Sequence, residues 1–259
     1  MNGQRIQMVD VHAHLYGEAF REDLEEVLKR AEEAGVVTIL CVSETVADAE
    51  EVLSLARKDR RVKACAGLHP EAAEDEALEE MVRFIRQHAD ELVAIGEVGL
   101  DYWIAKDEAT RETQRRVLAR QVSLALELGL PLNVHSRSAG RHTISLLKEL
   151  GAKEVLLHAF DGRASSAAGG LEAGYYFSMP PSLVRSPQKQ KLLRSLPLER
   201  LLLESDSPVL GPTLDERNEP ANLQVTCAEI ARIKGIPKEE VARITTLNAR
   251  RLFPKGLGD

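Results

Sequence analysis

The sequence of 259 residues predicts an α/β fold, a (β/α)8 barrel with extra C-terminal helices, built as one domain over residues 1–259. Short apolar runs alternate along the chain with longer amphipathic stretches, as expected for strands followed by helices. The apolar runs are continuous, which is typical of strands buried on both faces of a parallel sheet. Eight βα units in roughly 250 residues favour a closed barrel. A doubly wound open sheet is the second choice.

The elements follow in order along the chain. Strands are expected at residues 6–11, 36–42, 62–68, 92–95, 131–134, 155–157, 175–178 and 201–203. Helical patterns cover residues 21–34, 46–57, 78–88, 111–128, 141–150 and 189–196. Two more helices, 218–234 and 238–253, are expected after the last strand. Gly235 and Pro237 separate them, because glycine commonly ends a helix and proline commonly opens one.

Composition narrows the class of protein. Hydrophobic residues make up 44% and charged residues 29%, ordinary values for a soluble globular protein. No apolar run approaches the roughly 20 residues of a membrane span. We expect no signal peptide, because residues 1–5 run straight into the first expected strand. Cys41, Cys65 and Cys227 are odd in number and widely spaced, which fits reduced thiols in the cytoplasm. None has CxxC spacing, so no metal is expected at them. We expect a cytoplasmic protein with no membrane contact and no obligate protein partner.

The net charge of −7 argues against a broad basic surface that tracks long duplex DNA. It is compatible with a phosphate-bearing substrate held locally by metals and one or two arginines. A short or terminal nucleic-acid substrate is therefore favoured over an internal duplex site.

Histidines and acids gather where the expected strands end. His12 and His14 stand two residues apart, so in a strand both imidazoles leave the same face. In a barrel the active site lies at the carboxyl ends of the strands. Five of the seven histidines fall there, together with two acids. The set is His12, His14, His69, His135, His158, Glu97 and Asp206.

This set predicts a metal centre, because burying so many ionisable groups without a cation costs several kcal/mol. Six ligands are too many for one tetrahedral zinc ion. We expect two divalent metal ions (Zn, Mn, Mg or Co) roughly 3.5–4 Å apart and bridged by Glu97. One ion would take His12, His14, Asp206 and a Glu97 oxygen, and the other would take His135, His158 and the second Glu97 oxygen.

Eight short motifs in this order resemble the TatD family of metal-dependent deoxyribonucleases and related phosphoesterases. They cover residues 10–14, 67–70, 96–101, 135–137, 158–162, 205–208, 217–220 and 248–253. The resemblance spans nearly the whole chain. It implies a TIM barrel of the amidohydrolase superfamily, a divalent metal centre and hydrolysis of phosphate esters, often 3′ to 5′ on DNA. The family pattern carries its metal ligands onto the same six residues.

The chain departs from the family pattern at three positions. Members commonly have Cys or Ser where this chain has Ala159, Ser where it has Asp161, and Thr where it has Ser205. No expected ligand is lost. Asp161 adds a negative charge near a site meant for phosphate, so these departures bear on the substrate and not on the chemistry.

The expected reaction is metal-assisted hydrolysis, in which the metals activate a water molecule and Asp206 accepts its proton. Glu97 and Glu204 complete the catalytic set, with holding a ligand histidine as the alternative role for Glu204. Asp10 is expected to support His12 in the same way. Substrate contacts are expected from His69, Arg137, Asp101, Tyr102 and Trp103. Arg217 and Asn218 are expected either to close over the phosphate or, for Asn218, to cap the next helix.

Three alternatives stay open. An esterase or deacylase of the amidohydrolase type would use the same centre on a carbonyl group, and a small-molecule phosphatase would use it on a monoester. Glu97 on the fourth strand, where many binuclear amidohydrolases place a modified lysine, favours the phosphoesterase. A metal-binding scaffold without turnover is less favoured, because no expected ligand is missing.

Overall fold

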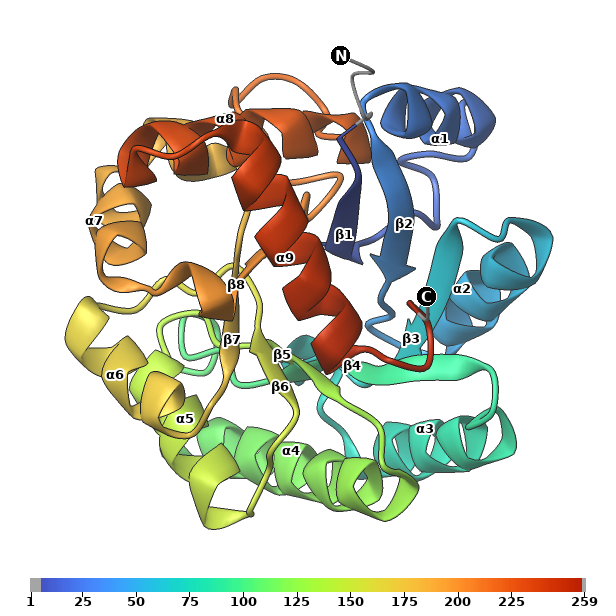
Figure 1. Ribbon diagram of the computed structural model, residues 1–259. Coiled ribbons are helices and arrows are strands. Elements are labelled where there is room, and N and C mark those ends of the chain that lie inside the picture. Colours follow the sequence, from blue (N-terminus) through green and yellow to red (C-terminus); the bar gives the residue numbers. More distant parts are fainter. Residues whose placement is uncertain (1–5, 258–259) are drawn as a thin grey trace.

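The computed structural model describes residues 6–257, and in it the predicted barrel is confirmed (Figure 1). Eight parallel strands pair in sequence order. They are β1 (Met8–Ala13), β2 (Val36–Cys41), β3 (Val62–Ala66), β4 (Leu92–Gly99), β5 (Leu132–His135), β6 (Val155–Leu157), β7 (Tyr176–Met179) and β8 (Leu201–Leu203). Two backbone hydrogen bonds bring the segment after β8 to β1. His14 N donates to Ser207 O at 2.8 Å, and Asp206 N donates to His12 O at 2.9 Å.

Helices cover the outside of the strands (Figure 1). They are α1 (Leu24–Glu33), α2 (Val46–Lys58), α3 (Asp75–Gln87), α4 (Glu108–Leu128), α5 (Gly140–Glu149), α6 (Ala164–Glu172), α7 (Pro187–Ser195), α8 (Leu223–Lys234) and α9 (Lys238–Leu252). The helix α6 was not predicted, because its run of alanine, serine and glycine shows no helical apolar period. None of the helices in residues 6–257 is both long and apolar enough to cross a membrane.

The helix α9 closes the amino-terminal end of the barrel. Its residues Ala249 and Leu252, and Phe253 directly after it, belong to the same buried cluster as the inward-facing strand residues. Asn248 Nδ2 donates to the carbonyl of Leu201 at the start of β8. With this end covered, the carboxyl ends of the strands remain as the open face of the barrel.

Bulges in two strands turn the functional side chains inward. The pairing of β1 with β2 shifts register between Asp10 and Ala13. Val11 belongs to the inner cluster and Ala13 to the outer one, although residues two apart share a face in a regular strand. The extra residue in the bulge therefore re-aims His12 into the barrel.

The same device recurs in β4. The pairing of β4 with β5 shifts register between Ile95 and Val98. Ala94 belongs to the inner cluster, whereas Val98 belongs to the outer one. The intervening shift turns Glu97 inward. The prediction ended this strand at residue 95, because Gly96 and Glu97 interrupt the apolar run. In the structure β4 continues to Gly99.

Candidate metal centre

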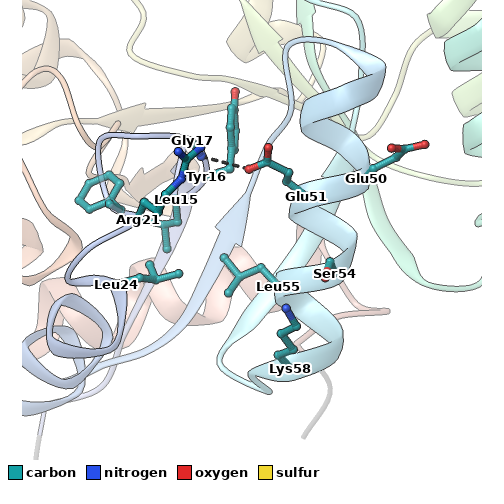
Figure 2. Close-up of a pocket in the computed structure, with 11 residues that line it drawn as sticks. Leu15, Tyr16, Gly17, Arg21, Leu24, Glu50, Glu51, Ser54, Leu55 and Lys58 are labelled. Carbon is teal, nitrogen blue, oxygen red and sulfur yellow. Dashed lines mark hydrogen bonds between the residues drawn. The ribbon is translucent and has the colours of Figure 1, made fainter.

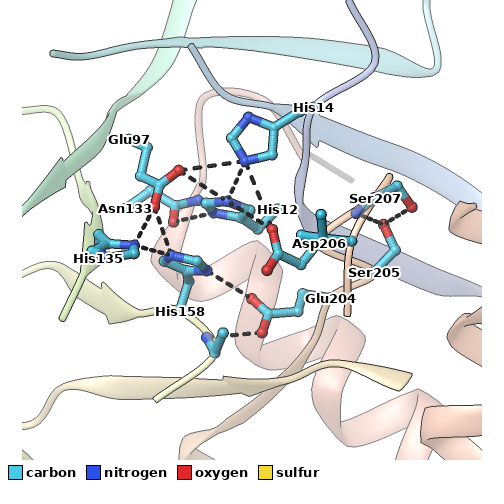
Figure 3. Close-up of polar contacts among 12 residues, drawn as sticks. His12, His14, Glu97, Asn133, His135, His158, Glu204, Ser205, Asp206 and Ser207 are labelled. Atoms are coloured by element: carbon cyan, nitrogen blue, oxygen red, sulfur yellow. Dashed lines mark hydrogen bonds and ion pairs between the residues drawn. The ribbon is translucent and has the colours of Figure 1, made fainter. Parts of the chain in front are cut away.

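The carboxylate of Glu97 lies between two pairs of imidazoles (Figure 3). Its Oε2 is 3.5 Å from His12 Nε2 and 3.4 Å from His14 Nε2. Its Oε1 is 2.7 Å from His135 Nδ1 and 2.8 Å from His158 Nε2. Each oxygen of one carboxylate therefore faces its own pair of potential ligand nitrogens.

The first group of ligand atoms is completed by Asp206 and has tetrahedral spacing. The two Nε2 atoms of His12 and His14 are 3.2 Å apart. Asp206 Oδ1 lies 3.6 Å from His12 Nε2 and 3.7 Å from His14 Nε2. Four ligands about 2.1 Å from a tetrahedral zinc ion are about 3.4 Å from one another. These four side chains thus fit a small divalent cation.

The second group contains His135, His158 and Glu97, whose two ring nitrogens are 3.3 Å apart. His69 Nε2 is also near, at 3.6 Å from Glu97 Oε1. However, His69 Nδ1 accepts a hydrogen bond from the backbone N–H of Glu71 at 3.2 Å. Neutral His69 therefore carries its proton on Nε2, which makes that atom a donor to an oxygen and not a metal ligand. Burial lowers the pKa of His69 to about 4, so the ring is neutral at physiological pH.

Hydrogen-bond acceptors behind the imidazoles fix their orientation. His12 Nδ1 donates to Asn133 Oδ1 at 2.9 Å, and His135 Nε2 donates to Asp101 Oδ2 at 2.9 Å. His14 Nδ1 lies 3.1 Å from the hydroxyl oxygen of Tyr16. Such partners hold a histidine in the tautomer that a metal requires. Asn133 and Tyr16 were missed from the sequence, although Asn133 precedes His135 by two residues and so shares its face of β5.

Glu204 lies behind His158 (Figure 3). Its Oε2 is 3.6 Å from His158 Nδ1 and accepts from Ser178 Oγ at 2.6 Å, while Oε1 accepts from Ala159 N at 2.8 Å. Glu204 is fully buried and does not line the cavity in front of the metal centre. This position favours the role of holding His158, and a direct catalytic role stays a prediction.

Asp10 does not hold the ring of His12. Its Oδ1 instead accepts from the backbone N–H groups of Ser205 and His12, at 2.8 and 3.3 Å. Burial raises the pKa of Asp10 to about 8. The side chain thus ties β1 to the segment that carries Asp206.

The pKa values of the two acids in the first group are shifted in opposite directions. Burial acts to raise the pKa of Glu97, but His158, His69 and His12 lower it well below its usual value. The pKa of Asp206 is raised by burial, against the opposing effect of His12 and His158. Glu97 is therefore a permanent anion at the centre, whereas Asp206 is the better proton acceptor.

A cavity of about 480 Å³ opens in front of these groups. Three of the five expected substrate-binding residues line it: His69, Asp101 and Arg137. Arg137 is 45% exposed and its Nε lies 2.9 Å from Asp101 Oδ2. Sequence reasoning missed further lining residues, namely Glu44, Glu71, Ser136, Lys189, Val209 and Leu210.

Tyr102 and Trp103 do not line this cavity. Tyr102 is buried, and its hydroxyl accepts from Arg115 Nη1 at 3.1 Å. Trp103 is 61% exposed, with Lys106 Nζ 4.9 Å from its ring centre. Trp103 is thus free to meet a partner from solvent, and both substrate contacts stay predictions.

Arg217 and Asn218 hold the loop after β8 in place through ion-pair and hydrogen-bond contacts. Arg217 Nη2 pairs with Asp23 at 2.5 Å, and Asn218 Nδ2 donates to the carbonyls of Ser205 and Val209. Asn218 does not cap a helix, because α8 begins at Leu223. Neither side chain lines the cavity at the metal centre.

A separate hollow lies between the segment after β1 and helix α2 (Figure 2). Its walls include the apolar side chains of Leu15, Leu24 and Leu55. Gly17 N donates to Glu51 Oε2 at 3.2 Å across it. The hollow is lined by no histidine, so the chemistry belongs to the cavity at Glu97.

Comparison with known proteins agrees with this geometry. The family model described as TatD related DNase matches residues 9–254. The chain belongs to this family. It is 48% identical to human "Deoxyribonuclease TATDN3" over 98% of this chain and 97% of that protein. It is 33% identical to "3'-5' ssDNA/RNA exonuclease TatD" of Erwinia tasmaniensis, over 95% of this chain and 99% of the other.

A solved structure gives the same family. The crystal structure of YJJV, a TatD homologue from Escherichia coli K12, superposes with a TM-score of 0.90 at 28% identity. The match covers 97% of this chain and 99% of that one. The whole barrel, including the strand ends that carry the candidate metal ligands, thus has a counterpart in this TatD homologue.

Proposed function

We propose that this protein is a deoxyribonuclease that depends on two divalent metal ions and releases nucleotides from the 3′ end of a DNA strand. One observation carries the proposal: Glu97 turns one carboxylate oxygen to His12 and His14 and the other to His135 and His158. Bridged metal pairs of this kind favour in-line attack on phosphate esters. The names of the human and Erwinia relatives support DNA as the substrate class.

When bound, the two metals would lower the pKa of a water molecule and neutralise charge on the phosphate. His12, His14, Glu97 and Asp206 would hold one ion, and His135, His158 and Glu97 the other. Asp206, whose Oδ1 faces His12 and His14 at the position of the first ion, accepts the proton of the attacking water. His69 Nε2–H and Arg137 donate to phosphate oxygens from the cavity wall.

The reaction joins the water oxygen to phosphorus and breaks the bond from phosphorus to the 3′ oxygen of the preceding nucleotide. The strand keeps a 3′-hydroxyl group, and the released nucleotide carries the 5′-phosphate. The proton that Asp206 accepts is available for the departing 3′ oxygen.

The test compares three substrates on the chelated protein and after Mn, Zn, Mg or Co is restored. They are an aryl phosphodiester, an aryl phosphomonoester and a short single-stranded DNA labelled at its 5′ end. The matched variant is Asp206→Asn, which keeps the side-chain shape but removes the base. Metal-restored shortening of the DNA from its 3′ end, lost in the variant by roughly 100-fold or more, is expected.

Other outcomes point elsewhere. Cleavage of the monoester alone would keep the mechanism and make the protein a small-molecule phosphatase. Bound metal without any phosphate-ester cleavage would overturn the proposal and favour an esterase or deacylase.

A further inference from the structure

Lys189 extends from helix α7 into the wall of the cavity at the metal centre. It lines this cavity together with His158 and Asp206. Its Nζ donates a hydrogen bond to the carbonyl oxygen of Ala159 at 2.8 Å. Ala159 directly follows the expected metal ligand His158, and its own N–H donates to Glu204. Ala159 therefore links Lys189 to Glu204, the carboxylate that lies behind the expected ligand His158.

The surroundings of Lys189 are unfavourable for a lysine. Burial lowers its pKa, against the attraction of Glu204 and Asp161. Its backbone N–H donates to the capping side chain of Ser186 at the amino-terminal end of α7, where the helix dipole opposes a positive charge. Within the described part of the chain, no carboxylate pairs with its Nζ. Residues that break such local rules are most often found at functional sites.

The charge of the cavity gives this lysine a use. Six carboxylates line the cavity: Glu44, Glu71, Glu97, Asp101, Asp161 and Asp206. Among the described lining residues, only Arg137 and Lys189 are arginine or lysine, and Arg137 is already paired with Asp101. An ammonium group has three N–H donors, and one of them is used by Ala159. Two donors remain for an anionic ligand.

We propose that Lys189 is a substrate-binding residue whose ammonium group donates to a non-bridging oxygen of the phosphate at the metal centre. This inference rests on the proposed function and adds to it. The Ala159 carbonyl holds Nζ at the cavity wall. The cation offsets the repulsion that Asp161 and the other acids exert on a phosphate.

The test uses the metal-loaded protein and three variants. Lys189→Gln removes the charge, Lys189→Arg keeps it, and Lys191→Gln is the matched control, because Lys191 is an exposed lysine of the same helix. Two measurements are made on each: kcat and KM on single-stranded DNA, and affinity for inorganic phosphate by calorimetric titration. Metal content and melting temperature are recorded to detect structural damage.

Lys189→Gln is expected to lower kcat/KM and phosphate affinity by about 10- to 100-fold, the range for a hydrogen bond to a charged group. The loss on DNA should be mainly in KM, and Lys189→Arg should recover part of it. Metal content should stay the same, and the melting temperature should stay the same or rise. Lys191→Gln should stay within about twofold of the unaltered protein.

Two kinds of failure are distinguishable. If the unaltered protein cleaves DNA and Lys189→Gln matches it, or loses activity only together with metal, this inference is overturned and the proposed function stands. If the protein binds phosphate through Lys189 but leaves DNA intact, the inference holds for another phosphate ester. Absence of both activities overturns both proposals.

Discussion

Asp101 and His135 share a hydrogen bond of 2.9 Å between Oδ2 and Nε2, which aims His135 Nδ1 at Glu97. The other oxygen, Asp101 Oδ1, accepts the backbone N–H groups of Trp103 and Ile104 at 2.8 and 3.1 Å. One buried carboxylate therefore orients an expected metal ligand and shapes the loop beside it. We therefore expect the proposed second metal position to be sensitive to Asp101, a residue that need not touch the metal.

Asp101→Asn tests that sensitivity. An amide has one acceptor oxygen, so it cannot accept from both His135 and the backbone N–H groups of Trp103 and Ile104. It also lacks the charge that increases the basicity of the ring. We expect affinity for the second metal equivalent to fall about 10- to 100-fold, while the first stays nearly unchanged. Competition with a chelating dye measures both. Asp90→Asn, the same change at an exposed residue, is the control. Equal weakening of both equivalents would contradict this assignment.

Glu204→Gln separates support of His158 from direct catalysis. An amide has one acceptor oxygen, so it cannot accept from both Ser178 Oγ and Ala159 N. The unsatisfied donor should lower the free energy of unfolding by roughly 1–3 kcal/mol. If Glu204 only positions His158, saturating metal should restore kcat to within a few-fold. A loss of kcat that persists at saturating metal, with melting unaffected, would show that Glu204 acts on the reaction itself.

Metal removal should destabilise the protein, because the centre packs carboxylates together with imidazoles. A bound cation would compensate the negative charge of those carboxylates. At a metal concentration about 1,000 times Kd, binding adds about 4 kcal/mol to the free energy of unfolding. For a chain of this size the melting temperature should rise by roughly 10 °C. Scanning calorimetry with chelator and with restored metal measures the shift. Glu97→Gln should abolish most of it, and an unchanged shift in that variant would place the metal elsewhere.

Trp103→Ala tests the expected substrate contact of the exposed indole, an aromatic ring on which a base can stack. Base stacking is worth about 1–3 kcal/mol, so KM for single-stranded DNA should rise at least about fivefold. The aryl phosphodiester, which has no neighbouring base, should be hydrolysed as before. Equal kinetics on DNA would make Trp103 a surface residue only. Exposed Leu214, changed to Ala, is a control of similar exposure.

The three cysteines should be inert in the native state. Cys41, Cys65 and Cys227 are buried and free. Burial raises the pKa of Cys41 to about 12 and of Cys227 to about 11, so few thiolates form at neutral pH. A thiol reagent at pH 8 should label none of them before denaturation and all three afterwards. Rapid labelling of the native protein would contradict the burial of these thiols.

The same cysteines predict how the free energy of unfolding changes at alkaline pH. Their pKa values in the folded state exceed the ordinary value of 9.0. The unfolded chain therefore loses thiol protons first as pH rises. Stability should fall between about pH 9 and pH 12, and Cys227→Ser should weaken this dependence. Chemical denaturation across that range measures this dependence on pH.

The expected cytoplasmic location stays a prediction.

Much of the architecture was readable from residue patterns, because continuous apolar runs and helical periods are local properties of the chain. The strands β6 and β8 were predicted at Val155–Leu157 and Leu201–Leu203, as observed. The helix α6 was not predicted, because its packing depends on small residues. A side chain at Gly170 would come within 2.9 Å of the Phe177 ring, a contact that no local pattern reveals.

Residue type and spacing also predicted which histidines and acids lie together at the strand ends, and their role as metal ligands stays a prediction. Their aim could not be predicted, because the bulges in β1 and β4 that turn His12 and Glu97 inward arise from pairing with neighbouring strands. Tertiary contacts likewise set Asn133 behind His12 and brought Lys189 to the cavity from a distant helix. Side-chain direction and long-range contact depend on how the whole barrel closes, whereas strand and helix patterns depend on neighbours along the chain.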